Sequence, residues 1–129
     1  MIAVDTNIIV RLLTQDDEKQ YRQSLDLFSK NEIVILDTVI LETEWVLRFA
    51  YNFDSIAISR AFTKLFGLPN IHVSNPDRLA QAIKWHTSGM DFADAFHLAQ
   101  CENVNCFFTF DNKLINKSKK LSSCQVVKP

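Results

Sequence analysis

Short apolar runs alternate with longer amphipathic stretches along this chain. The apolar runs span residues 2–4, 33–36, 71–73 and 106–110, and three of them lead directly into an aspartate. Short apolar runs bounded by polar residues are typical of strands that are buried on both faces of a sheet. A shorter run at 125–127 predicts a fifth strand.

The stretches between these runs carry apolar residues at spacings of three and four, which predicts helices. Residues that commonly cap helices mark their starts: Asp16 or Asp17, Thr38, Asp54 or Ser55, Asn75 and Asp91. The predicted helices cover about 7–13, 17–30, 39–51, 55–66, 76–87 and 92–102, with a short one after residue 111. Strands that alternate with helices indicate an α/β fold with a central parallel sheet of about five strands and helices on both faces.

Glu42 interrupts one of these helical patterns. It shares a predicted stripe with Val39, Val46 and Phe49, which are all apolar. A glutamate in an apolar stripe is costly unless it is paired, and no lysine or arginine lies at a matching spacing on that face. Arg48 is six residues away and points elsewhere. We therefore expect Glu42 to have a purpose beyond solvation.

Composition supports one globular domain over residues 1–129. Only two glycines and three prolines occur, 47% of the residues are hydrophobic, and no apolar run approaches the roughly 18 residues of a membrane span. Met1 leads directly into the first predicted strand without a secretory leader pattern, which predicts a cytoplasmic protein. Three cysteines without CxxC spacing argue against a disulfide framework or a zinc site.

The net charge of −1 gives no general support for nucleic-acid binding. Lysines do cluster late in the chain, at Lys113, Lys117, Lys119 and Lys120. Such a run is more often a solvated face than a binding surface.

Carboxylates stand where the predicted fold would bring them together. Asp5 and Asp111 each follow a strand, and the carboxyl ends of parallel strands form the edge where α/β proteins bind ligands. Glu42 and Asp94 lie on helices that begin on the same side. Each has a simpler explanation, because Asp5, Asp91 and Asp111 could be helix caps and the other two could be solvated.

Taken together, the carboxylates favour a cation site. Carboxylates within about 4–5 Å repel one another by roughly 3–4 kcal/mol per pair at an effective dielectric near 20, so they must hold either protons or a cation. Oxygen ligands favour Mg²⁺ or Mn²⁺ over zinc, and His97 is the one nearby nitrogen. Such an ion can activate a water and stabilise the leaving oxygen of a phosphodiester.

Four segments in order resemble the PIN domain: 2–7 (IAVDTN), 41–48 (LETEWVLR), 91–99 (DFADAFHLA) and 109–111 (TFD). More closely, the chain resembles the VapC-type toxins of bacterial type II toxin–antitoxin pairs. No single segment is decisive, whereas four in order at this length make a strong match. The resemblance implies a three-layer PIN-like fold and an Mg²⁺- or Mn²⁺-dependent endoribonuclease.

The resemblance also assigns roles to residues and implies partners. The catalytic and metal-binding quartet would be Asp5, Glu42, Asp94 and Asp111. Supporting positions next to the metal would be Thr6, Asn7, Asp91 and Thr109. The resemblance leaves the RNA-contacting surface unidentified, and the sequence offers Arg11, Arg48 and Lys113 as weak candidates for RNA contacts. The family implies a homodimer that is inhibited by a VapB-type antitoxin, contact with DNA only through that antitoxin, and in many members structured RNA substrates such as tRNA.

Three other functions fit parts of the pattern. A receiver-type phosphoacceptor domain would need an acidic pair after the first strand and a lysine directly after a late strand, whereas Asp5 precedes Thr6 and Asp111 precedes Asn112. An aspartyl phosphatase would want a second aspartate where Asn7 stands. A PIN fold kept as a non-catalytic binding scaffold is disfavoured by the complete quartet.

Overall fold

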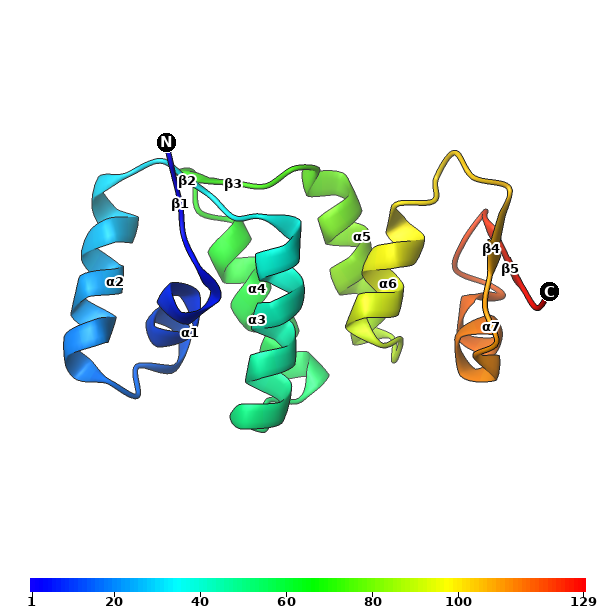
Figure 1. The fold of residues 1–129 in the computed structure, drawn as a ribbon, viewed down its shortest axis with the longest axis horizontal. Coiled ribbons are helices and arrows are strands. Elements are labelled where there is room, and N and C mark those ends of the chain that lie inside the picture. Colours follow the sequence, from blue (N-terminus) through cyan, green and yellow to red (C-terminus); the bar gives the residue numbers. More distant parts are fainter. The chain divides into compact units, whose positions relative to one another are not determined.

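The computed structural model describes residues 1–129. The chain forms two compact units, Met1–Ser74 and Asn75–Pro129. The first unit contains three strands and four helices, and the second contains two strands and three helices (Figure 1). None of the seven helices combines the length and the apolar character that crossing a membrane requires.

The first unit has a parallel sheet at its centre. Its strands are β1 (Ile2–Ala3), β2 (Ile33–Val34) and β3 (Ile71–His72), in the order β1-β2-β3. Ile33 pairs with Ile2 on one side and Ile71 on the other, and Ile33 is fully buried. The first three predicted strands are therefore confirmed as neighbours in one parallel sheet.

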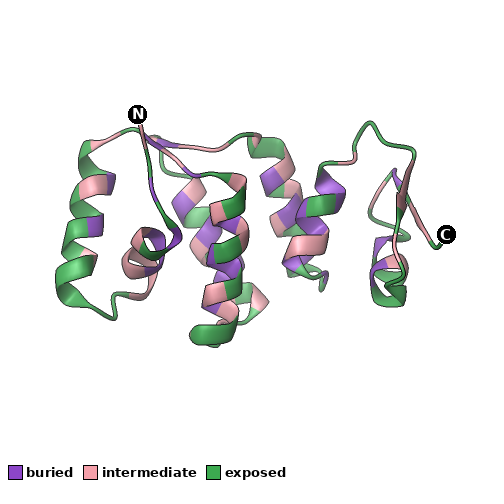
Figure 2. Cartoon of the chain, viewed as in Figure 1, coloured by how far each residue is buried: buried purple, intermediate pink, exposed green.

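The helices of the first unit are α1 (Thr6–Thr14), α2 (Glu18–Lys30), α3 (Asp37–Ala50) and α4 (Ser55–Phe66). Asp17 caps α2 by accepting a hydrogen bond from the Gln20 backbone, and Asp54 caps α4 in the same way through Ala57. Both caps agree with the sequence. Ile9 of α1, Leu47 of α3 and Phe62 of α4 are buried in this unit's core, as Figure 2 shows for the buried faces of these helices.

Helix α3 differs from the prediction in its start and in its buried face. It begins at Asp37 with Leu36 as its N-cap, so Thr38 is not the cap. Its buried residues are Ile40, Thr43, Glu44 and Leu47. The stripe that contains Glu42 is half-buried at Val39 and Val46 and exposed at Glu42 and Phe49. The prediction that Glu42 is buried among apolar neighbours is wrong, because the buried face is rotated toward Glu44.

The second unit contains α5 (Pro76–Thr87), α6 (Phe92–Ala99), β4 (Cys106–Phe108), α7 (Asn112–Ser118) and β5 (Gln125–Val127). Helices α5 and α6 pack together through buried residues that include Trp85 and Phe92. Strands β4 and β5 are parallel, with Phe107 opposite Val126. The predicted caps Asn75 and Asp91 are confirmed.

Two details of the second unit correct the sequence-based expectation. Helix α6 ends at Ala99, three residues before the predicted end. Strand β4 is shorter than the apolar run 106–110, and Phe108 and Phe110 are exposed rather than buried. The α/β class with parallel strands is confirmed, and the five strands are hydrogen-bonded as a set of three and a set of two. The three cysteines are free thiols.

Candidate functional site

Asp5 stands between the first strand and the first helix. It follows buried Val4 and is the N-cap of α1, where its Oδ1 accepts a hydrogen bond from the Thr6 backbone N–H at 2.7 Å. The side chain is exposed, and its second oxygen accepts no hydrogen bond. Capping therefore uses one oxygen of Asp5 and leaves the other free for a ligand.

Thr6 connects Asp5 to Glu42. The Thr6 side chain is buried, and its hydroxyl donates a hydrogen bond to Oε1 of Glu42 on α3. Because α1 packs against α3, this bond holds the exposed Glu42 carboxylate next to the start of α1. We call Asp5 and Glu42 the N-terminal acidic pair.

A pocket of about 330 Å³ joins the two members of this pair. Helices α1 and α3 supply most of its wall. Its lining consists of Asp5, Thr6, Asn7, Val10, Arg11, Glu42, Val46, Ala50 and Tyr51. Five residues to which the sequence analysis gave roles thus share one concave surface within the first unit: Asp5, Thr6, Asn7, Arg11 and Glu42.

A second group of carboxylates lies in the second unit. Asp91 caps α6 by accepting a hydrogen bond from the Asp94 backbone N–H at 3.2 Å, and Asp94 lies half-buried in the first turn. Burial, followed by the negative charges of Asp91 and Asp111, raises the pKa of Asp94 above its ordinary value, while His97 opposes the shift. We call Asp91, Asp94 and Asp111 the C-terminal acidic trio.

Asp111 resembles Asp5 in its local role. It caps α7, with its Oδ1 accepting from the backbone N–H groups of Lys113 at 2.9 Å and Leu114 at 3.2 Å. Its own backbone N–H donates to the Thr109 hydroxyl at 3.0 Å. The other carboxylate oxygen of Asp111 accepts no hydrogen bond. Thr109 therefore positions the turn that presents Asp111.

The donor chemistry suits a hard divalent cation. The pair and the trio offer carboxylate oxygens, which Mg²⁺ and Mn²⁺ prefer, and the repulsion felt by Asp94 is one that a cation would relieve. Within neither unit, however, do three or more His, Cys, Asp or Glu side chains gather into a group that could hold a metal ion.

Sequence reasoning missed the buried ion pair of α3. Glu44 is 2% exposed, and its Oε2 faces Arg48 Nε at 3.0 Å. The Arg48 guanidinium also lies over the Phe49 ring, 4.6 Å from its centre. The i,i+4 spacing of Glu44 and Arg48 was the available clue. Arg48, a candidate for RNA contact, is thus held by Glu44.

The other two candidates for RNA contact lie in different places. Arg11 lines the pocket of the N-terminal acidic pair and hydrogen-bonds with Asp16, Gln20 and Tyr51. Lys113 is exposed in the first turn of α7, beside Asp111.

Comparisons with known proteins identify the family of this chain. Residues 2–120 match the family model described as PIN domain, so a single family model spans both units and all four carboxylates of the quartet. Among solved structures, the chain is similar to VapC20 of Mycobacterium tuberculosis, described as a sarcin-ricin loop cleaving toxin, at 18% identity and a TM-score of 0.45, covering 97% of this chain and 99% of that one. No curated protein matches the sequence.

Proposed function

Because the chain belongs to the PIN-domain family, whose members are typically nucleases that use divalent metals, we propose that it is an Mg²⁺- or Mn²⁺-dependent endoribonuclease. We further propose that it is the toxin of a type II toxin–antitoxin pair. The main observation behind the proposal is that the PIN family model matches a range that contains both acidic groups. Asp5 and Glu42 also line one pocket, and the negative charge of Asp111 contributes to the raised pKa of Asp94.

Asp5, Glu42, Asp94 and Asp111 would hold the ion. Bound there, a divalent cation would supply a more acidic water as nucleophile, stabilise the charge on the leaving oxygen of the phosphodiester, and offset the negative charge that repels an RNA backbone.

The chain's own residues prepare these carboxylates. The Thr6 hydroxyl fixes the rotamer of Glu42, and the α1 and α7 N-termini orient Asp5 and Asp111 through one oxygen each. Asp91 holds the first turn of α6 and adds negative charge beside Asp94. Thr109 supports the turn before Asp111. These contacts keep the free oxygens in fixed directions, which favours ligand binding without a cost in rearrangement.

The sequence resemblance supplies the proposed partners. A VapB-type antitoxin would bind the protein and place a C-terminal segment near the active site, and the protein would act as a homodimer. Structured RNA such as tRNA is the proposed substrate class. DNA would be contacted only through the antitoxin.

Sequencing of RNA ends after brief expression tests this function. Cells that express the wild-type protein should accumulate new RNA ends at a small set of sites, and cells that express Asp5→Asn should not. The purified wild-type protein should cut the same RNA with Mg²⁺ or Mn²⁺ and not with EDTA. A folded wild-type protein that cuts no RNA with either ion would contradict the proposal and favour a non-catalytic scaffold.

A further inference from the structure

One positively charged side chain, that of Arg11, lines the pocket of the N-terminal acidic pair. Of the nine residues that line it, two are acidic and only Arg11 is positively charged. Asp5 caps the start of α1, and Arg11 lies six residues later, about 9 Å farther along the helix axis at 1.5 Å per residue. One wall of the pocket thus runs from a carboxylate to a guanidinium.

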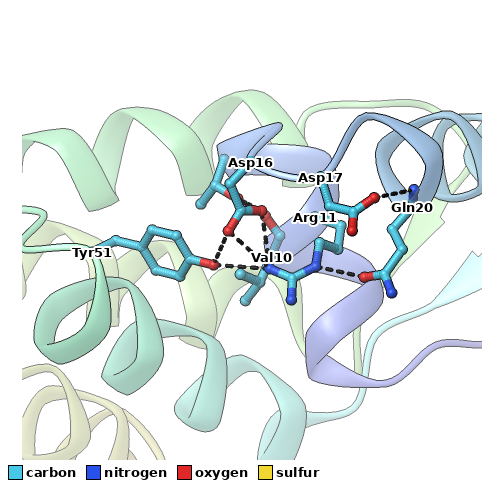
Figure 3. A network of polar contacts seen from close by, with 7 residues as sticks. Val10, Arg11, Asp16, Asp17, Gln20 and Tyr51 are labelled. Carbon is cyan, nitrogen blue, oxygen red and sulfur yellow. Dashed lines mark hydrogen bonds and ion pairs between the residues drawn. The ribbon is translucent and has the colours of Figure 1, made fainter.

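The guanidinium of Arg11 is held from several sides (Figure 3). Its Nε donates to Gln20 Oε1 at 2.6 Å. Its Nη1 donates to Tyr51 Oη at 2.9 Å and to the two carboxylate oxygens of Asp16 at 3.0 and 3.1 Å. Its Nη2 makes no hydrogen bond, so two N–H donors of a fixed group are unused.

The backbone brings these partners together. Gln15 ends α1 with a left-handed conformation, φ 55°, and its N–H bonds to the Arg11 carbonyl. This turn reverses the chain so that Asp16 reaches back to Arg11. A left-handed glutamine is unfavourable by about 1 kcal/mol, a strain of the kind that is often kept where a side chain must be placed.

Tyr51 links Arg11 to the helix of Glu42. It follows the last turn of α3, accepts from Arg11 and donates its hydroxyl hydrogen to Asp16 Oδ2 at 2.6 Å. The Tyr51 hydroxyl is the largest cause that lowers the pKa of Asp16 and raises the pKa of Arg11. Both charged groups therefore stay ionised across the physiological range, and the guanidinium stays oriented.

We propose that Arg11, oriented by Tyr51 and Asp16, binds a phosphate of the RNA strand next to the one that is cut, and so positions the substrate in this pocket. The proposal rests on the endoribonuclease function proposed above. Arginine suits phosphate because its planar fork of donors matches phosphate oxygens, and contacts to phosphates set the register of a nucleic acid. Asp16 offsets part of the positive charge, so Arg11 acts mainly in positioning.

Kinetics of Arg11→Gln and Arg11→Lys beside a matched control test this role. The control is Arg22→Gln, because Arg22 also pairs with one carboxylate, Glu18 at 2.6 Å, yet is 75% exposed and does not line this pocket. On a short RNA substrate, Arg11→Gln should raise KM about tenfold with kcat changed less than threefold, as expected for loss of a charged hydrogen bond in binding. Arg11→Lys should recover part of that loss, and Arg22→Gln should match wild type.

Binding measured without cleavage separates this inference from the proposed function. In the Asp5→Asn background, Arg11→Gln should weaken binding of the same RNA and reduce the slope of log affinity against log salt by about 1. Tyr51→Phe, which keeps Arg11 but removes its anchor, should raise KM by a smaller factor.

Three results would overturn the inference. Arg11→Gln could keep the wild-type KM and salt slope, it could shift them no more than Arg22→Gln, or it could act only by lowering the melting temperature. Any of these results would mean that Arg11 links α1, α2 and α3 and does not bind the RNA. A wild-type protein that binds RNA through Arg11 but never cuts would instead contradict the nuclease function and leave only the contact between Arg11 and a phosphate standing.

Discussion

The N-terminal acidic pair and the C-terminal acidic trio hold their carboxylates in different ways. In the pair, a buried hydroxyl from Thr6 bonds to Glu42, and a helix N-terminus holds Asp5. In the trio, Asp94 is half-buried under the charges of Asp91 and Asp111, and its pKa is raised. Hydrogen bonds thus hold the carboxylates of the pair in place. The carboxylates of the trio instead repel one another, and a bound cation would relieve that repulsion.

The largest expected effect tests whether both groups serve one reaction. Asp5→Asn and Asp94→Asn should each reduce RNA cleavage by more than about 100-fold, since even residues that only support metal ligands account for about 10–100-fold. Circular dichroism should show that both variants fold. Asp26→Asn, which changes an exposed residue paired with Lys30, is the control and should cut normally. Full activity in either variant would remove that group from the reaction.

Next in size is a contrast between two glutamates on α3. Glu44→Gln should lower the free energy of unfolding by about 3 kcal/mol, because it breaks a buried ion pair with Arg48. Glu42→Gln should change stability by less than about 1 kcal/mol and should abolish cleavage. Urea unfolding and cleavage per folded molecule measure the two effects. If Glu44→Gln stopped cleavage in folded protein and Glu42→Gln did not, Glu44 would serve the reaction and Glu42 would not.

A smaller effect concerns the repulsion inside the trio. Because Asp94 has a raised pKa in the folded protein, its charged form disfavours folding, and stability from this group should rise as the pH falls through that pKa toward the unfolded value near 3.8. Asp91→Asn keeps a good N-cap but removes one negative charge. In EDTA, it should stabilise the protein at pH 7 by a few tenths of a kcal/mol.

Urea midpoints at pH 5 and pH 7, for wild type and Asp91→Asn, provide the measurement. The gain at pH 7 should shrink at pH 5, where Asp94 is closer to protonation. An equal gain at both pH values would show that Asp91 acts on stability by some route other than the charge of Asp94.

The smallest effect tests the anchor of Arg11. Tyr51→Phe should raise the pKa of Asp16 toward its ordinary value, because the Tyr51 hydroxyl is the main group that lowers it. A carboxylate with a lowered pKa stabilises the folded state above its unfolded pKa, and that contribution is lost as the pH falls through the lowered value. NMR titration of the Asp16 carboxyl carbon reports the shift. An unchanged pKa in Tyr51→Phe would show that Asp16 is held by other groups.

Sequence reasoning succeeded where the physics is local. The caps Asp17, Asp54, Asn75 and Asp91 follow from side chains that reach a backbone N–H within the next turn, and all four are present. The short strands were found from their apolar runs, although only Ile33 and Ile71 among the strand residues are buried.

It failed where a helix had to be rotated onto a core. Helix α3 has apolar residues on both sides, so spacing alone did not decide which side was buried, and the stripe of Val46 and Phe49 was preferred over that of Ile40 and Leu47. The exposed aromatics Trp45 and Phe49 show how little apolarity alone fixes the face. The grouping of Glu42 with Asp5 depends on packing between α1 and α3, which no local pattern encodes. Convergence of the pair with the trio stays a prediction.

A manganese titration followed by NMR tests that convergence most directly. Mn²⁺ broadens signals from nuclei near it, so a single site made of the pair and the trio predicts that the amides around Asp5, Glu42, Asp94 and Asp111 broaden together with one midpoint. Asp94→Asn should then abolish the broadening around Asp5 and Glu42 as well. Broadening confined to one group, or unchanged around Asp5 in Asp94→Asn, would contradict the proposal that one metal site cuts RNA in this protein.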